Sequence, residues 1–245
     1  LIFIHWYIYI LMKQQKKILV FTATYNEINN VEKLLLRIKK TRLDLDILIL
    51  DDNSPDGTGE KLQKFEKKMK NLFFLSRKSK QGLDSAHKIA YSFAKKKNYD
   101  YLITMDADLS HDPKEIKNFI YYLEQYPFVI GSRYMKGGKC LMKGKRLLLS
   151  KMGNMLIRNI LRINLTEFTT SYRGFNLKML KNFSLNRVQN KGYSFFMGTV
   201  YEIYKLKFTI KEIPIIFRDR EKGYSKIPKL EIFRTFKNVI LLSFK

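Results

Sequence analysis

The sequence predicts an α/β fold in which a mostly parallel sheet is flanked by helices. Between residues 17 and 133, short apolar runs alternate with segments whose apolar residues recur every three or four positions. This alternation is typical of parallel strands joined by helices. The chain has 245 residues and is 45% hydrophobic, which is enough for one sizeable core and therefore indicates one main domain.

Five apolar runs have the length and composition of buried strands. We expect these strands at residues 18–21, 47–50, 72–75, 101–105 and 128–130. Helices are expected around residues 31–38, 62–69 and 83–94 and after Asp112. Asp112 can cap that last helix, Pro113 suits its first position, and Glu115 stands three residues after the cap.

The pattern changes after Tyr134. Residues 136–146 are basic and contain glycines, so we expect a mobile loop there, followed by a helix at residues 147–161. Residues 208–217 are expected to form a strand, and Pro214 favours an edge position because proline has no N–H to donate. The last predicted element is an amphipathic helix at residues 230–244.

The two ends of the chain are expected to lie outside the main domain, which we place at residues 13–228. Residues 1–12 are almost wholly apolar, but they are too short to span a bilayer and lack the preceding basic residues of a signal peptide. We expect Met12 to be the true start and residues 1–11 to be upstream read-through or a fragment edge. Residues 1–12 are therefore assigned to a non-native or disordered extension outside the domain, with an interfacial anchor as the alternative. Residues 229–245 are expected to form a C-terminal interfacial helix.

Charge and cysteine content narrow the class of protein. Lys and Arg number 47 against 22 Asp and Glu, which gives a net charge of +25. Such an excess predicts an anionic partner, either nucleic acid, a phosphorylated substrate or an anionic membrane surface. Cys140 is the one cysteine, which excludes an intramolecular disulfide and favours a reducing cytoplasmic location. No run of about 18 apolar residues occurs, so no membrane-spanning helix is expected.

Polar residues follow four of the expected strands directly. They are Tyr25 to Glu27, Asp51 and Asp52, Asp106 to Asp108, and Arg133. In parallel sheets, ligands bind beyond the carboxyl ends of the strands. We therefore expect these side chains, which are far apart in sequence, to meet in one site.

Asp106 and Asp108 are the strongest candidates for a metal site. Residues two apart point the same way in an extended chain, so both carboxylates could share one Mg²⁺ or Mn²⁺ with phosphate oxygens and water. A solvated turn is the alternative.

Two further candidates each allow two interpretations. Asp51 and Asp52 either contact a nucleobase or ribose or belong to an Asp-rich turn. His111 either contributes to the site or lies on a surface loop.

A basic set follows in the second half of the chain. Its members are Arg133, Arg146, Arg173, Arg218, Arg220 and Lys226. Guanidinium groups bind phosphate oxygens through two parallel hydrogen bonds. Several such cations near one acidic metal site would suit a substrate with two separate phosphate groups, whereas any single one can be a solvated charge.

In this order, these residues resemble the family-2 glycosyltransferases with the GT-A fold, and within them the dolichol-phosphate or polyprenol-phosphate mannosyltransferases. The resemblance covers residues 17–226. The matching motifs lie at residues 24–27, 51–58, 82–83, 106–113, 131–134, 137–138 and 214–215 and at Arg220, Gly223, Ser225 and Lys226. The chain departs from the usual pattern at Ala23, Asp84, Glu167 and residues 170–175.

The resemblance implies roles for named residues in a GT-A catalytic domain. The residues expected to be catalytic are Asp106, Asp108, Arg133 and Arg220. The metal, Mg²⁺ or Mn²⁺, would be held by Asp106 and Asp108, with Ser110 able to complete its shell. The residues expected to bind the substrates are Thr24, Tyr25, Glu27, Asp51, Asp52, Lys80, Ala107, Arg146, Arg173 and Lys226.

The resemblance also implies the reaction and its location. Mannose would pass from GDP-mannose to a dolichyl or polyprenyl monophosphate with inversion, on the cytoplasmic face of a membrane. The expected partners are these two substrates, an anionic membrane surface and a small membrane-anchoring subunit. The alternatives are a related enzyme that uses UDP-glucose or another donor, a non-catalytic sugar-nucleotide binder, and a basic nucleic-acid-binding protein. The acidic strand ends argue against the last, so no nucleic acid is expected.

Overall fold

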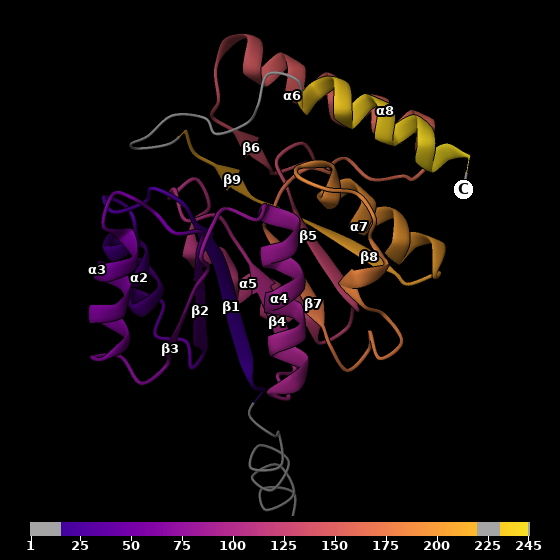
Figure 1. Ribbon diagram of the computed structural model, residues 1–245. Helices are drawn as coiled ribbons and strands as arrows, with labels where there is room; N and C mark the ends of the chain where they lie inside the picture. Colours follow the sequence, from indigo (N-terminus) through magenta and orange to yellow (C-terminus); the bar gives the residue numbers. More distant parts are fainter. Residues whose placement is uncertain (1–15, 220–230, 245) are drawn as a thin grey trace, which may run out of the picture.

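The computed structural model describes residues 16–219 and 231–244. Its centre is a seven-stranded sheet with the order β3-β2-β1-β4-β7-β5-β8. These strands are β1 (Ile18–Thr24), β2 (Asp46–Asp51), β3 (Leu72–Ser76), β4 (Tyr101–Thr104), β5 (Phe128–Ser132), β7 (Arg173–Asn176) and β8 (Ile210–Pro214). Helices cover both faces of the sheet (Figure 1), so the expected α/β class is confirmed.

The helices follow the predicted alternation with the strands in the first half of the chain. They are α2 (Val31–Lys40), α3 (Thr58–Glu66), α4 (Leu83–Lys96), α5 (Ile116–Leu123), α6 (Gly144–Leu161), α7 (Ser194–Lys205) and α8 (Glu231–Ser243), with short 3-10 turns at Pro113–Glu115 and Leu185–Arg187. Asp112 caps the first of these turns, because its carboxylate accepts from the backbone N–H of Lys114 at 3.1 Å. The helix start predicted at Asp112 is therefore confirmed, although its first turn is 3-10.

Six of the seven central strands include a parallel pairing. β1 lies between β2 and β4, β2 also pairs with β3, and β5 pairs with β8, all in parallel. β7 is antiparallel to both β4 and β5. The sequence analysis missed β7 because its residues, Arg-Gly-Phe-Asn, lack the apolar run that marks the other strands. It also missed α7.

Side chains alternate along the strands between two hydrophobic cores. In β1, Leu19 and Phe21 belong to the core that includes α4 and α7, whereas Val20 belongs to the core that includes α2 and α5. This two-sided burial explains why the strands read as continuous apolar runs rather than as alternating patterns. It also leaves the carboxyl ends of the strands as the place where polar groups can meet.

The segment at residues 136–146, expected to be a mobile loop, contains regular structure. β6 (Lys139–Cys140) pairs in parallel with β9 (Ile216–Phe217), and α6 begins at Gly144. A two-residue strand whose partner lies far along the chain has no local sequence pattern, so the loop expectation was wrong here. The edge position predicted from Pro214 is confirmed, since β8 ends the sheet and the chain then leaves it to form β9.

The predicted C-terminal helix is present as α8. Val239 and Leu242 are buried in the core next to α6 and α7, whereas Ile240, Leu241 and Phe244 are exposed. The expectations for residues 1–12 lie outside the described residues. Among the helices that the structure describes, none combines the length and the apolar character needed to cross a bilayer.

Gly174 in β7 provides a test of how closely α5 packs on the sheet. A Cβ at this position would lie 2.9 Å from Cδ1 of Leu123 and 3.1 Å from Cδ1 of Phe119. We expect Gly174→Ala to lower the free energy of unfolding by about 1–3 kcal/mol, because a close-packed core accepts no extra methyl group. Urea denaturation measures this change.

The matched control is Gly153→Ala in α6, where nothing lies within 4 Å of the added Cβ. Because alanine favours helix over glycine, this change should leave stability unchanged or raise it by up to about 1 kcal/mol. An equal loss in both variants would contradict the described packing of α5.

Candidate active site

The polar strand ends of β1 and β2 lie side by side, as the sequence predicts. Thr24 and Asp51 are partners in the parallel register of the two strands. The Thr24 hydroxyl donates to Oδ1 of Asp51 at 2.8 Å, and Ser54 donates to the same carboxylate through its N–H at 2.8 Å and its hydroxyl at 2.6 Å. Asp51 is therefore buried at the end of β2, where its carboxylate holds the turn that follows, which supports the Asp-rich turn for this residue.

Asp52 forms a buried ion pair with Arg77, a residue that the sequence analysis did not select. Arg77 also donates to the hydroxyl of Ser85 at 2.5 Å and to the carbonyl oxygen of Gly82 at 3.1 Å. The local signal was its position directly after the third predicted strand. The pair fixes the Asp52 carboxylate at the rim of the site, and its predicted contact with a nucleoside stays a prediction.

Tyr25 and Lys80 come together from different loops. The Lys80 ammonium lies 4.4 Å from the centre of the Tyr25 ring, a distance at which a cation is attracted by the ring face. Glu27 precedes the turn that leads into α2, and its carboxylate accepts from the side-chain amide of Asn30 at 2.7 Å. Tyr25, Lys80 and Glu27, all expected to bind the substrates, thus lie around the end of β1.

The turn after β4 holds the two candidate metal ligands. Residues 107–109 form a bend, and Leu109 has a φ of 66°, so the expectation of an extended chain is wrong. Oδ1 of Asp106 accepts from the Ser171 hydroxyl at 2.5 Å, and Oδ1 of Asp108 accepts from the N–H and hydroxyl of Ser110 at 3.1 and 2.6 Å. The turn is therefore held by its own side chains and by residue 171.

The donor set at this turn suits a hard divalent cation. Asp106 is 37% exposed at its side chain, whereas Asp108 and Ser110 are buried. Within residues 16–219 and 231–244, no group of three or more His, Cys, Asp or Glu side chains is placed to hold a metal ion. Two carboxylates can still hold Mg²⁺ or Mn²⁺ if diphosphate oxygens and water supply the remaining ligands. The residues present fit a metal that is shared with its substrate.

His111 is buried, so the surface-loop interpretation is wrong. Its Nδ1 accepts from the backbone N–H of Asp106 at 3.1 Å, and its ring packs against Tyr172 and Phe217 at centroid distances of 4.8 and 5.3 Å. Burial lowers the pKa of His111, although the charges of Asp106 and Asp108 act in the opposite direction. A neutral imidazole thus stabilises the turn by accepting from the backbone N–H of Asp106.

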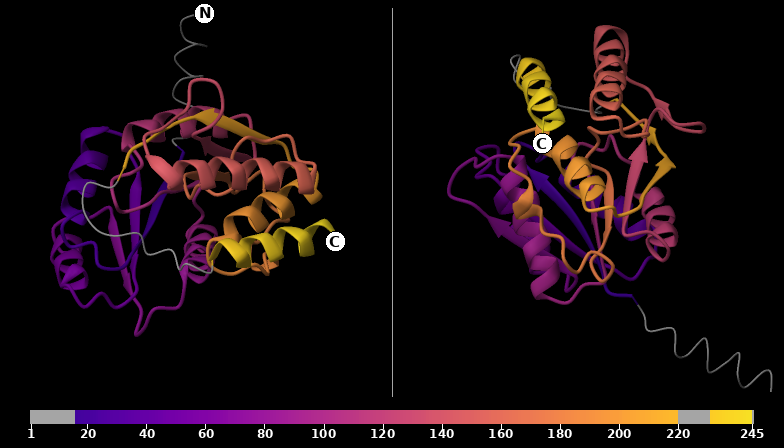
Figure 2. Two further views of the ribbon diagram at one scale, coloured as in Figure 1. Left: turned by 90° about the horizontal axis from the view of Figure 1, so that it is seen from above. Right: turned by 90° about the vertical axis from the view of Figure 1, so that its right-hand side faces the viewer.

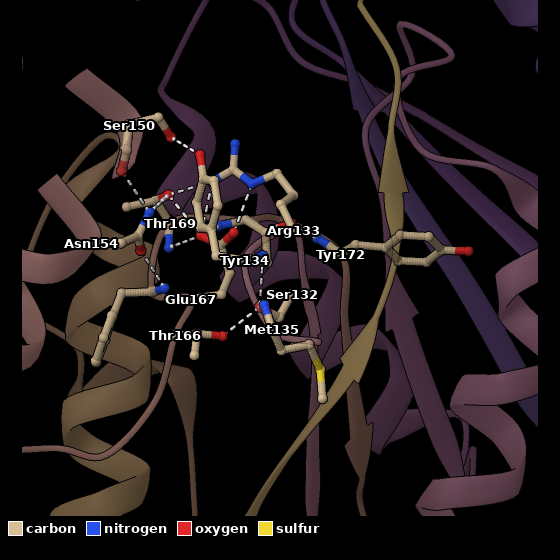
Figure 3. A network of polar contacts seen from close by, with 12 residues as sticks. Ser132, Arg133, Tyr134, Met135, Ser150, Asn154, Thr166, Glu167, Thr169 and Tyr172 are labelled. Carbon is tan, nitrogen blue, oxygen red and sulfur yellow. Dashed lines mark hydrogen bonds and ion pairs between the residues drawn. The ribbon is translucent and has the colours of Figure 1, made fainter. Parts of the chain in front are cut away.

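Arg133 is held at the end of β5 by a buried carboxylate. Its Nε donates to Oε2 of Glu167 at 2.6 Å and its Nη2 to Oε1 at 2.8 Å (Figure 3). Burial alone would lower the pKa of Arg133, but the adjacent Glu167 raises it. Burial likewise would raise the pKa of Glu167, but Arg133 and neighbouring donors lower it. Both groups are therefore charged, and together they fix the guanidinium in one orientation.

The loop at residues 166–171 links this ion pair to the acidic turn. Oε1 of Glu167 accepts from the backbone N–H groups of Thr169 and Thr170, and Ser171 donates to Asp106. Behind the loop, Glu212 accepts from the N–H of Thr166 at 2.9 Å, and burial raises the pKa of Glu212. One short loop thus contacts both the candidate metal ligand Asp106 and the candidate phosphate-binding residue Arg133.

The inner face of α6 closes the site from the other side. Ser150 is bonded to the hydroxyl of Tyr134 at 2.7 Å, and the side-chain oxygen of Asn154 accepts from the N–H of Phe168 at 2.8 Å (Figure 3). A pocket of about 430 Å³ lies at this junction. It is lined by Arg133, Tyr134, Gly138, Cys140, Lys151, Asn154, Met155, Arg158, Leu165 and Thr166.

Arg173 has a structural role, because its guanidinium donates its hydrogen bonds to backbone groups of the protein. Its guanidinium is buried and donates to the carbonyl oxygens of Phe168, Thr170 and Phe196 at 2.6–2.7 Å. Burial lowers the pKa of Arg173 to about 9, with the charge of Glu167 opposing the shift. Because this arginine holds the loop and α7 together through backbone groups, its predicted contact with a substrate has no support from the geometry.

The remaining basic candidates lie on the rim of the site or outside the described residues. Arg146, in the first turns of α6, is 51% exposed, with its Nη1 at 3.6 Å from the Asp219 carboxylate. Arg218 is 49% exposed and lies 3.6 Å from the Asp112 carboxylate. Arg220 and Lys226 fall outside the described residues, so their predicted roles stay predictions.

Comparisons with known proteins identify the fold and the relatives of the chain. Residues 19–183 match the family model "Glycosyl transferase family 2". The chain is 33% identical over 212 residues to an undecaprenyl-phosphate mannosyltransferase of Micrococcus luteus, covering 86% of this chain and 87% of the relative. It is 32% identical over 219 residues to a polyprenol monophosphomannose synthase of Mycolicibacterium smegmatis, covering 88% and 83%.

Solved structures share the fold at lower identity. A mannosyltransferase from Pyrobaculum calidifontis in complex with GDP-mannose and Mn²⁺ superposes with a TM-score of 0.55 at 15% identity, covering 91% of this chain and 66% of that one. The crystal structure of a mycobacterial protein gives a TM-score of 0.66 at 14% identity, covering 94% and 74%. The GT-A fold expected from the motifs is confirmed.

The Arg133–Glu167 pair makes a testable contribution to stability. We expect Glu167→Gln to lower the free energy of unfolding by about 3–5 kcal/mol, because it leaves a buried guanidinium without its counter-charge. Replacing both partners, as in Glu167→Gln with Arg133→Met, should recover a large part of this loss. Urea denaturation of the single and double variants measures both values, and a loss below about 1 kcal/mol for Glu167→Gln would contradict a buried charged pair.

Proposed function

The chain belongs to glycosyl transferase family 2, and from that premise we propose that it transfers mannose from GDP-mannose to a polyprenyl or dolichyl monophosphate. The family expected from the motifs is thus the correct one. The observation that carries the proposal is the loop at residues 166–171, which joins the acidic turn at Asp106 to the buried Arg133. A site with one acidic end and one cationic end suits a metal-bound diphosphate beside a second phosphate.

The named polyprenyl-phosphate enzymes support the acceptor and the sugar of this proposal. Both relatives cover most of the chain, and both carry a lipid phosphate and mannose in their names. The structure from P. calidifontis, whose title names GDP-mannose, shares the fold and supports a nucleotide-bound donor of this kind.

The chemistry of a lipid phosphate explains which residues the site needs. A phosphate monoester has a second pKa near 6, so it is largely a dianion at neutral pH. Such an oxygen can attack the anomeric carbon without a protein base. What the protein must supply is alignment of two anions that repel each other. Arg133, oriented by Glu167, is placed for this task, and we assign Arg146, Arg220 and Lys226 to the same set.

In this proposal the acidic turn receives the donor diphosphate. Asp106 and Asp108 would hold Mg²⁺ or Mn²⁺ together with diphosphate oxygens, and Ser110 keeps Asp108 oriented through its N–H and hydroxyl. When bound, the metal neutralises charge on the departing diphosphate. Tyr25, with Lys80 over its ring, would lie against the nucleoside. A single displacement of this kind inverts the configuration at the anomeric carbon.

The same acceptor places the protein at a membrane. A polyprenyl chain stays in the bilayer, so the reaction takes place where the lipid phosphate meets water. The cytoplasmic location expected from the single cysteine places the protein on the cytoplasmic face, as a peripheral protein.

An assay with competing donors tests the proposed reaction. We expect radiolabelled mannose from GDP-mannose to enter the lipid fraction when undecaprenyl phosphate in detergent is present, and no label to enter without the acceptor. UDP-glucose serves as the competing donor in a parallel reaction. Preferred transfer of glucose would replace the donor in this proposal, and the absence of transfer from either donor would refute a transferase role.

The metal site can be tested at one carboxylate. We expect Asp108→Asn to lower the turnover of mannose transfer by at least about 10–100-fold, because loss of even an outer-sphere partner weakens a metal site by that factor. Asp46→Asn is the matched control. Asp46 is the first residue of β2, at the end of the strand away from the site, and it accepts from the Tyr99 hydroxyl. Removal of divalent ions with EDTA should abolish transfer, and added Mg²⁺ or Mn²⁺ should restore it. Full activity of Asp108→Asn would contradict the site.

A further inference from the structure

The two carboxylates of the acidic turn are held by different means. The Asp108 carboxylate accepts from the N–H and the hydroxyl of Ser110, which belongs to the same turn. The hydrogen bond between Asp106 and His111 uses the backbone N–H of Asp106 and leaves its carboxylate free to bond elsewhere. In the part of the chain that the structure describes, the one hydrogen-bond donor to the Asp106 carboxylate is the hydroxyl of Ser171.

His111 does not provide a second donor to this carboxylate. Its Nδ1 lies 3.8 Å from Oδ2 of Asp106, which is beyond hydrogen-bond distance. The same Nδ1 accepts from the Asp106 N–H at 3.1 Å, and a ring nitrogen that accepts a hydrogen bond carries no proton of its own. Oδ2 of Asp106 is therefore the carboxylate oxygen left for another ligand.

The Ser171 hydroxyl is placed for a strong hydrogen bond. Its Oγ lies 2.5 Å from Oδ1 of Asp106, and Ser171 is the donor because an ionised carboxylate only accepts. Contacts of this length are typical of a hydroxyl that donates to a charged oxygen. Ser171 is buried, so little water reaches the hydroxyl to compete for it.

The direction of β7 explains how Ser171 reaches the acidic turn. β7 lies between β4 and β5 and is antiparallel to both, so its amino end lies at the carboxyl ends of its neighbours. Ser171 lies just before β7, and its carbonyl oxygen accepts from the Thr104 hydroxyl of β4 at 2.5 Å. Seen from above, the early part of the chain (indigo to purple) and the later part (orange) lie side by side (Figure 2). The amino end of β7 brings a residue of the later part to the turn.

The contact between Ser171 and Asp106 is not needed to hold the loop in place. Strand pairing and the Thr104 hydroxyl already fix the backbone here, and Arg173 donates to carbonyl oxygens of the loop. The Asp106 side chain is 37% exposed, so water can replace a lost donor at little cost in stability. Orientation of a ligand explains the contact better than stabilisation of the fold.

We propose that Ser171 is a positioning residue for a divalent cation bound by the acidic turn. Its hydroxyl occupies Oδ1 of Asp106 and fixes the carboxylate in one orientation, which leaves Oδ2 for the metal. Carboxylates that bind metals are themselves hydrogen-bonded, and these partners raise the affinity of the site. The inference deepens the proposed function and rests on it for the metal and for a nucleoside diphosphate that shares it.

Binding of Mn²⁺ to the full chain tests the proposal without turnover. Electron paramagnetic resonance of free Mn²⁺ measures the dissociation constant in the presence of GDP. We expect Ser171→Ala to weaken Mn²⁺ binding by about 10–100-fold, the usual cost of losing a group that orients a metal ligand. Adding Ser171→Ala to Asp106→Asn should weaken binding no further than Asp106→Asn alone, because Ser171 acts through that carboxylate.

Three further measurements distinguish positioning from a loss of structure. Ser171→Thr keeps the hydroxyl and should bind Mn²⁺ like the wild type. GDP binding in EDTA and thermal unfolding of the metal-free protein should be the same in Ser171→Ala and the wild type. In the mannose transfer assay, the Mn²⁺ concentration that gives half the maximal rate should rise about 10–100-fold in Ser171→Ala, whereas the rate at saturating Mn²⁺ should stay close to that of the wild type.

Ser184→Ala is the matched control. The Ser184 hydroxyl oxygen accepts from the N–H of Asn186 at 3.3 Å, at the start of the 3-10 turn Leu185–Arg187, which contacts α4. This variant also deletes a hydrogen-bonded serine hydroxyl, but one without a contact to the acidic turn. Its Mn²⁺ affinity should equal that of the wild type.

The outcomes separate this inference from the proposed function. Equal Mn²⁺ affinity of the wild type and Ser171→Ala would overturn the inference and leave the proposed reaction intact, and so would a folded Ser171→Thr variant that binds Mn²⁺ as weakly as Ser171→Ala. If the wild type binds Mn²⁺ with GDP but transfers no mannose, the proposed function fails and the inference stands. If the wild type binds no Mn²⁺ with either GDP or UDP, the inference fails, and the transfer assay decides the reaction separately.

Discussion

The buried ion pair of Arg133 and Glu167 is the interaction on which the site depends. Glu167 is fully buried and accepts from two nitrogens of Arg133 and from backbone N–H groups of its own loop. Removing two charges from water costs more than an isolated pair returns, so such pairs persist where every donor and acceptor is satisfied. The satisfied network explains why the guanidinium keeps one orientation, and an oriented cation is what the proposed site for two phosphates requires.

The loop at residues 166–171 is hydrogen-bonded by side chains from three other parts of the chain. Arg173 binds its carbonyl oxygens from below, Asn154 of α6 binds the N–H of Phe168, and Glu212 binds Thr166. Ser171, the last residue of the loop, donates from its hydroxyl to Asp106. The loop therefore connects the acidic turn with Arg133, although their residues come from distant parts of the sequence. Rigid placement of charge avoids reorganisation when two anions bind.

The sequence was most informative where structure is local. The strand β1 and the turn at Asp106 follow from an apolar run and the polar residues after it, and the edge strand β8 follows from Pro214. The sequence did not predict β7. This strand contains Arg173 instead of a continuous apolar run, and it is stabilised by pairing with strands on both sides, which are far away in the sequence. The role of His111 was also hidden, since a buried neutral histidine differs from an exposed one only in its surroundings. Motif order, by contrast, identified the family, because it reflects the whole site rather than one residue.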